Sequence, residues 1–125
     1  MITIGDLRVA IGANTVKELT RLTSPPGTDI TSELEEETAQ PFIDAVEAEV
    51  LGWFNRGVVD WTEDASNAAL TMHVARLVGT AWIKAANDGR EVPSCTDSVT
   101  FIKSVAFGRV SLGGLETTEG TPYVN

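Results

Sequence analysis

The chain has 125 residues, 42% of them hydrophobic, which suits one globular domain and excludes an intrinsically disordered protein. Its net charge of −9 is concentrated between residues 29 and 64, a segment that contains eleven acidic residues and one basic residue, Arg56. DNA-binding surfaces need the opposite sign, so we expect no specific nucleic-acid binding.

Membrane and secretion signals are not expected in this chain. No apolar run approaches the ~20 residues that a membrane span needs. The first residues lack the basic start and apolar stretch of a signal peptide. We therefore expect no membrane association, and a protein that stays in the compartment where it is made.

A first short helix is predicted directly after Thr3. Thr3 and Asp6 have the spacing of a capping box, in which each side chain accepts a hydrogen bond from the other residue's backbone. Leu7 and Ile11 lie four residues apart and share one apolar face. Gly12 is expected to end this helix with a positive φ.

A second short helix is predicted after Gly12. Thr15 and Glu18 repeat the capping-box spacing, and Leu19 lies on the apolar side. Residues 24–29, with two prolines and a glycine, should then form a loop.

The next start signal is Thr31 followed by Ser32, with four glutamates close behind. Negative side chains near a helix N-terminus are favoured by the helix dipole. Pro41 would cost ~3 kcal/mol deep inside a helix, so we expect it in a first turn or at a bend. From there an amphipathic helix is predicted to end near Gly57, and its core residues are Phe42, Val46, Val50 and Trp53.

A long alanine-rich helix of roughly six turns is predicted next, as the central helix of the fold. Thr62 or Asp64 is expected to cap it, and the segment 87–89 to close it. Its predicted core residues are Leu70, Val74, Leu77, Val78 and Trp82.

The last predicted helix is capped by Thr96 or Asp97 and stopped by Gly108. Its core residues are Ile102 and Val105. Residues 109–115 then alternate briefly, as a strand does. Because one strand cannot satisfy its own backbone groups, either residues 58–61 or another subunit should pair with it.

These elements predict an all-α protein, a compact bundle of about five helices in residues 1–107, with an extended C-terminal strand or arm in 108–125. Two of the helices are short, two are long, and a short one ends the bundle. The candidate assembly residues at the start and end of the arm are Gly108, Arg109, Val110, Ser111, Leu112, Leu115 and Tyr123.

No catalytic or metal-binding pattern stands out. The chain has one histidine, His73, and one cysteine, Cys95, which cannot build a structural zinc site. No nucleotide-binding glycine loop is present, and no spacing places a base next to a nucleophile. We therefore expect no enzyme activity, no cofactor and no metal.

The acidic segment is expected to be a solvated helix face. Such a face could form a wall past which DNA slides without sticking, because like charges repel. The candidate residues facing a DNA channel are Glu33, Glu35, Glu36, Glu37, Asp44 and Glu47.

Two stretches resemble a known family. Residues 4–12 read Ile-Gly-Asp-Leu-Arg-Val-Ala-Ile-Gly, and residues 101–112 read Phe-Ile-Lys-Ser-Val-Ala-Phe-Gly-Arg-Val-Ser-Leu. They resemble the opening helices and the final helix with its exit in head–tail adaptor (connector or joining) proteins of long-tailed phages, especially the Mu-like group. The arginine-, tyrosine- and proline-rich turn that the family often carries is missing at residues 55–61.

The resemblance implies a structural virion protein, made in the bacterial host cytoplasm and located at the head–tail junction. It implies a homo-oligomeric ring, a dodecamer, that joins the portal protein to tail or neck proteins and lets DNA pass. From another class, the alternative is an acidic regulatory or binding module, antitoxin-like or a DNA-mimic inhibitor, that binds a basic partner.

Overall fold

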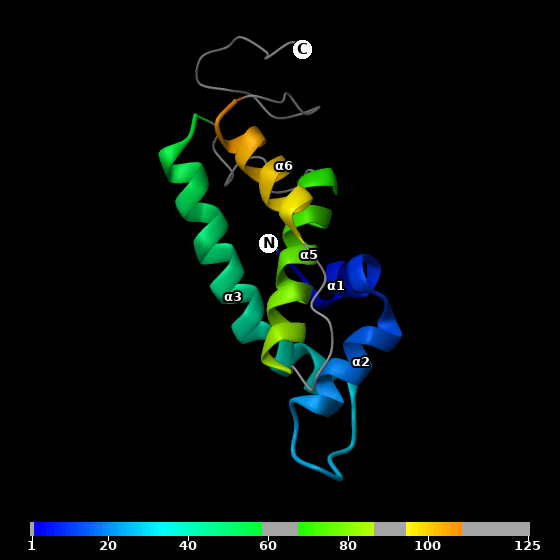
Figure 1. The fold of residues 1–125 in the computed structure, drawn as a ribbon. Coiled ribbons are helices and arrows are strands. Elements are labelled where there is room, and N and C mark those ends of the chain that lie inside the picture. Colours follow the sequence, from blue (N-terminus) through cyan, green and yellow to red (C-terminus); the bar gives the residue numbers. More distant parts are fainter. Residues whose placement is uncertain (1, 59–67, 87–94, 109–125) are drawn as a thin grey trace.

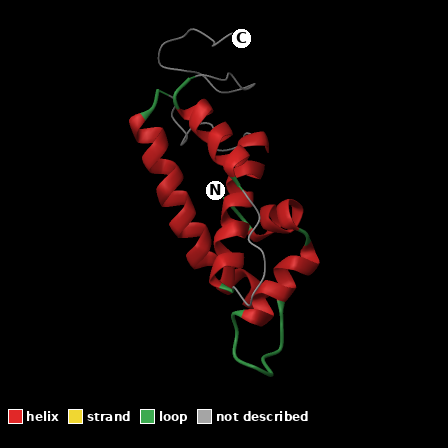
Figure 2. Cartoon of the chain, viewed as in Figure 1, coloured by secondary structure: helices red, strands yellow, loops and turns green. Residues whose placement is uncertain are grey.

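All regular structure in the described part of the chain is helical (Figures 1 and 2). The computed structural model describes residues 2–58, 68–86 and 95–108. The helices are α1 (Ile4–Ile11), α2 (Ala13–Leu22), α3 (Ser32–Arg56), α5 (Ala68–Ala85) and α6 (Thr96–Ala106). The predicted all-α bundle, with two short, two long and one short C-terminal helix, is confirmed. None of these helices is long and apolar enough to cross a membrane.

Helices α1 and α2 follow each other without a linker. The capping box at the start of α1 is confirmed, since Thr3 Oγ1 accepts from the Asp6 amide at 3.2 Å and Asp6 Oδ2 accepts from the Thr3 amide at 2.9 Å. Gly12 has a φ of 93°, which ends α1 and lets α2 begin at the next residue. The second predicted capping box is therefore wrong, because Thr15 already lies inside α2 and Gly12 takes the N-cap position.

Helix α3 is continuous over 25 residues, and Thr31 caps it by accepting from the Leu34 amide at 3.1 Å. Pro41 lies inside this helix, beyond its first turn, so the first-turn position predicted for it is wrong, and the other predicted position, a bend, stays a prediction. Pro41 is exposed, so the lost hydrogen bond falls on the side where water can solvate the free carbonyl. Ala39 and Ile43 are buried on the other side and keep the helix packed across the proline.

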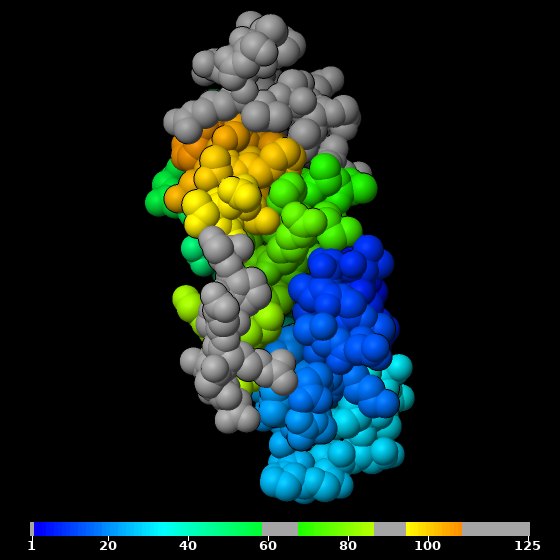
Figure 3. Space-filling model, turned by 45° about the vertical axis from the view of Figure 1, so that its right-hand side comes forward, coloured from blue at the N-terminus to red at the C-terminus, as the bar shows by residue number. Residues whose placement is uncertain are grey.

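Helix α5 is the centre of the bundle. It packs against α1, α3 and α6, and Figure 1 shows α3 on one side of it and α1 with α2 on the other. In the turned view of Figure 3, α6 and the α1–α2 pair cover different parts of α5. A side-chain carbon at Gly79 would lie 2.7 Å from Ile11 Cγ2, so the glycine lets α1 approach closely.

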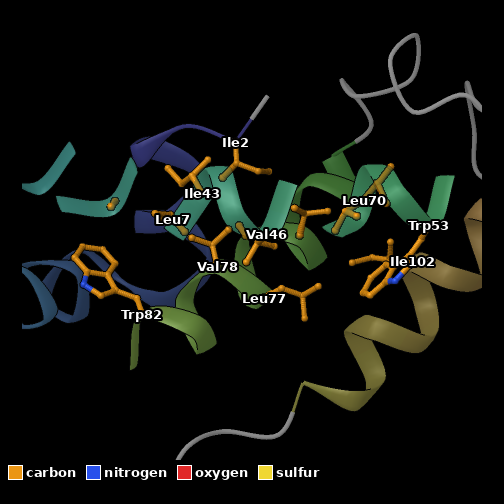
Figure 4. Packing of buried hydrophobic residues seen from close by; sticks show 14 of the residues in the cluster. Ile2, Leu7, Ile43, Val46, Trp53, Leu70, Leu77, Val78, Trp82 and Ile102 are labelled. Carbon is orange, nitrogen blue, oxygen red and sulfur yellow. The ribbon is translucent and has the colours of Figure 1, made fainter. Parts of the chain in front are cut away.

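The core runs along α5, from Trp82 at one end to Trp53 and Ile102 at the other (Figure 4). Two residues expected in it, Ile11 and Phe42, are only partly buried and pack against its edge. The Phe42 ring stacks on Trp82 with centroids 5.8 Å apart. The other predicted core residues are buried, namely Leu7, Leu19, Val46, Val50, Trp53, Leu70, Val74, Leu77, Val78, Trp82, Ile102 and Val105.

The cap of α6 comes one or two residues earlier than predicted. Cys95 takes the N-cap position in place of Thr96 or Asp97, which become the first residues of the helix. Several predictions lie outside the described residues: the caps at Thr62 and Asp64, the closing segment 87–89, and the strand or arm beyond Gly108.

Candidate functional site on helices α3 and α5

Four carboxylates form an exposed acidic surface on the outer side of α3: Glu33, Glu36, Glu37 and Asp44. Within the described residues, no cation forms an ion pair with any of them. Among the described side chains, the Gln40 amide contacts this group and donates to Asp44 Oδ1 at 2.8 Å. The acidic surface is therefore not neutralised by the described part of its own chain.

The helical repeat explains why these side chains point outward. Glu33, Glu37 and Asp44 are spaced by four and seven residues, which places them on one side of a helix with 3.6 residues per turn. Ala39 and Ile43 lie on a different side of the helix and are buried in the core. The dipole of α3 favours the glutamates in its first turns.

Glu35 does not belong to the acidic surface, which corrects the expectation that it faces a channel. It is 9% exposed, and Arg8 Nη2 of α1 lies 3.4 Å from its Oε1. Glu35, Ala39 and Ile43 follow at steps of four residues, so Glu35 shares the buried side of the helix. Its carboxylate fastens α1 to α3.

Glu47 is half-buried, so it too lies outside the exposed acidic surface, although it was expected to face a channel. Its Oε2 accepts a hydrogen bond from the backbone amide of Ile2 at 3.2 Å. The six acids expected along a channel thus divide into four that face solvent and two that hold the N-terminal segment against α3.

A groove lies between α3 and α5, close to the start of α6, with a volume of about 240 Å³. We call it the α3–α5 groove. Its walls carry opposite charges, with Glu49 on α3 and Lys84 on α5, and Cys95 lies at the α6 end. Its apolar lining consists of Val46, Val50, Trp53, Leu77, Ala81 and Val99.

A contact between α5 and α6 brings together the single histidine and a serine. His73 Nδ1 lies 2.9 Å from Ser98 Oγ, and the His73 ring stacks on Phe101 with centroids 4.2 Å apart. Burial, and to a lesser degree the nearby Arg76 guanidinium, lower the pKa of His73 below its ordinary value. The imidazole is therefore neutral at pH 7.

The His73–Ser98 pair was missed in the sequence because 25 positions separate the two residues. A neutral imidazole beside a hydroxyl is the first requirement for activating a nucleophile. Ser98, however, is only 4% exposed, and in the described part of the chain no carboxylate hydrogen-bonds the second ring nitrogen of His73. The geometry is that of a packing link between two helices.

Metal ligation has no candidate within the described ranges, where no three residues of histidine, cysteine, aspartate or glutamate are placed to hold an ion. Of the predicted arm residues, the structure describes only Gly108, which has a φ of 75° just after α6. Arg109, Val110, Ser111, Leu112, Leu115 and Tyr123 lie outside the described residues.

Searches for similar proteins found no matching family model, no matching curated protein and no matching solved structure. Three features of the described residues remain as candidate sites. They are the acidic surface and the α3–α5 groove, and, as a packing link and not a site of chemistry, the His73–Ser98 contact.

Proposed function

We propose that this chain is a structural virion protein, a head–tail adaptor that forms a ring between the portal and the tail or neck and lets DNA pass. The observation that carries the proposal is the acidic surface, which no cation of the described residues neutralises, on the longest helix described in the bundle. The resemblance of the first and last helices to phage adaptors supports the same function.

An unneutralised acidic surface has a physical cost that a functional role would explain. Glu33 and Glu37 are four residues apart on one helix face, where like charges destabilise by ~0.2–0.5 kcal/mol per pair. Such a surface repels the phosphate backbone, so DNA that moves past it is not retained. A passage for DNA is therefore a setting in which this charge pattern is useful.

The alternative function, an acidic module that captures a basic partner, is favoured by the same carboxylates. The two functions differ in what they require of the protein. A capture module binds its partner with an affinity that falls steeply with salt, because the attraction is between exposed charges. An adaptor is instead required for the particle to acquire a tail.

The experiment that tests the adaptor function is removal of the gene from the phage, followed by electron microscopy of the particles. We expect DNA-filled heads without tails, and tailed particles again when the full chain is supplied from a plasmid. Tailed particles in the absence of the protein would rule out the adaptor. Salt-sensitive binding to a basic host protein would then support the capture module.

The role of the acidic surface is tested separately, in particles complemented with a variant. The variant carries Glu33→Gln, Glu36→Gln, Glu37→Gln and Asp44→Asn. We expect tailed particles that release DNA more slowly than those with the control substitution Asp29→Asn, which removes an exposed acid from the loop before α3. Unchanged release, or a ring with these residues on its outer rim, would remove the channel role and leave the adaptor role standing.

A further inference from the structure

We propose that the α3–α5 groove of one copy of this chain receives apolar side chains that follow Gly108 in a second copy. The inference rests on the proposed function, because an adaptor ring brings many copies together. It adds the site at which one subunit holds the next.

The α3–α5 groove has the size and chemistry for one or two apolar side chains. Val46, Trp53 and Leu77 line it and keep 8% exposure each, whereas most of the core is fully buried. A volume of about 240 Å³ lies below the ~300–1,000 Å³ of typical small-molecule pockets. The groove therefore fits an anchoring residue of a protein segment better than a cofactor.

The segment after Gly108 supplies such anchors. Seventeen residues follow Gly108, and Val110, Leu112 and Leu115 lie within the first seven of them. No strand edge exists in the described residues, so β-sheet pairing within this part has no template. Anchoring by side chains in a helical groove is the mode of recognition that the described residues offer.

The reach of the segment favours a second copy as the host. Cys95 and Gly108 lie at opposite ends of α6, which is about 16 Å long at ~1.5 Å per residue. Val110 and Leu112 extend at most ~14 Å beyond Gly108, at ~3.3–3.6 Å per residue. Leu115, seven residues after Gly108, could span this length at ~23–25 Å. Val110 and Leu112 fall short of the Cys95 end of their own groove, whereas a neighbouring copy can present that end to Leu112.

The charges on both sides are complementary. Glu49 and Lys84 stand on opposite walls of the groove, and neither forms an ion pair with another described residue. In the C-terminal segment, Arg109 and Glu116 flank Leu112. With Leu112 between the walls, one orientation pairs Arg109 with Glu49 and Glu116 with Lys84.

Cys95, which is the only cysteine of the chain, gives a direct test. Unmodified protein is mixed with a variant that carries Cys95→Ser and Leu112→Cys, and the mixture is oxidised. A disulfide requires Cα atoms about 4.4–6.8 Å apart, so it reports docking of the segment at the groove. The control variant carries Cys95→Ser and Thr118→Cys, which places the thiol in the polar part of the segment.

We expect about tenfold more disulfide-linked dimer from Leu112→Cys than from Thr118→Cys, on non-reducing gels with mass spectrometry of the linked peptides, since tenfold corresponds to ~1.4 kcal/mol of preference. Equal yields, or no dimer from either, would overturn the proposal. A variant with Leu112→Cys and the native Cys95 adds a further check. A bond formed only within one chain would assign the segment to its own groove and would also overturn it.

Charge substitutions provide a readout that does not depend on a new thiol. Lys84→Glu should reduce the yield of the Leu112→Cys cross-link, and adding Glu116→Lys to the partner chain should restore it. Failure of this inference is separable from failure of the proposed function. If particles without the gene lack tails but no cross-link forms in assembled particles, docking of the segment in the α3–α5 groove is refuted and the adaptor function stands. If the cross-link forms but the gene deletion gives normal tails, the adaptor function is refuted and docking in the groove stands.

Discussion

The backbone amide of Val58 donates a hydrogen bond to the carbonyl oxygen of Ala106 over 2.7 Å, which joins the end of α3 to the end of α6. Gly57 lies directly before Val58, and a side-chain carbon there would collide with the same Ala106 carbonyl group. The two helix ends meet because residue 57 carries only a hydrogen. This contact closes the bundle at the point where the described chain ends.

Gly57→Ala should therefore lower the free energy of unfolding by about 1–3 kcal/mol, the usual cost of forcing a methyl group into a packed site. The control is Gly52→Ala, at a position inside α3 with no atoms near the added carbon. It should instead raise stability by about 0.5–1 kcal/mol, because alanine favours the helix. Urea unfolding followed by circular dichroism measures both. Equal effects of the two substitutions would contradict the collision.

The two arginine–glutamate pairs found among the described residues should differ in their contribution to stability. The side chains of Arg8 and Glu35 are 32% and 12% exposed, whereas those of Arg21 and Glu18 are 59% and 38% exposed. Arg8→Met leaves the Glu35 carboxylate buried without its partner and should cost about 1–2 kcal/mol, between the values for surface and fully buried pairs. Arg21→Met should cost less than about 1 kcal/mol. Adding Glu35→Gln to Arg8→Met should recover part of the loss, and a double-mutant cycle in urea measures it.

His73 should titrate below its ordinary pKa of 6.5, because burial and Arg76 both disfavour the imidazolium. It is the only histidine, so a proton NMR titration follows it without ambiguity. Arg76→Gln should move its pKa back toward 6.5. An unshifted or raised pKa in the folded protein would contradict the buried contact with Ser98.

The same shift predicts how stability depends on pH. The unfolded chain binds a proton on His73 more tightly than the folded chain does. The contribution of neutral His73 to stability is therefore fully present above pH 6.5 and is lost as the pH falls from 6.5 toward the pKa of His73 in the folded protein. The urea midpoint of the protein should therefore fall more between about pH 7 and pH 5 than that of His73→Gln, which has no group titrating there. A parallel decline in both proteins would show that other groups dominate.

Gly79→Ala tests the close approach of α1 to α5. The added carbon would lie 2.7 Å from Ile11 Cγ2, so α1 must shift, and we expect a loss of about 1–3 kcal/mol. In the background of Ile11→Ala the same change should be neutral or stabilising, because the obstructing methyl group is gone and alanine favours the helix. The coupling between the two substitutions, measured by chemical unfolding, should be about 1 kcal/mol or more. Additive effects would place the cost of Gly79→Ala elsewhere.

Apolar periodicity was enough to predict the helical bundle, because the spacing of residues such as Val46, Val50 and Trp53 fixes one buried side of a helix. Local signals were less decisive. Thr15 has the spacing of a capping residue, yet the positive φ of Gly12 starts α2 three residues earlier. Pro41 was expected in a first turn or at a bend, yet it lies well inside α3, where buried contacts at Ala39 and Ile43 on both sides of it outweigh the lost hydrogen bond.

The candidate sites were only partly predictable. Glu35 was predicted to be exposed because it stands among other acidic residues. It is four residues before the buried Ala39, however, and this spacing places both side chains on the same, buried side of the helix. The partner of Glu35, Arg8, comes from another helix, as Ser98 does for His73. Such pairs depend on how helices pack, which local spacing does not specify. The α3–α5 groove is likewise a product of packing between distant segments.

Pro41 has a mechanical consequence for α3. Without an amide hydrogen at residue 41, the Glu37 carbonyl loses its helical donor, so the helix bends more easily at this point than elsewhere. The residues before it carry most of the acidic surface, and those after it anchor Trp53 in the core. The proline thus lies between the charged first turns of α3 and the turns that hold Trp53, and the first turns depend on the contact of Glu35 with Arg8 and on the burial of Ala39 to stay in place beside this weaker point of the backbone.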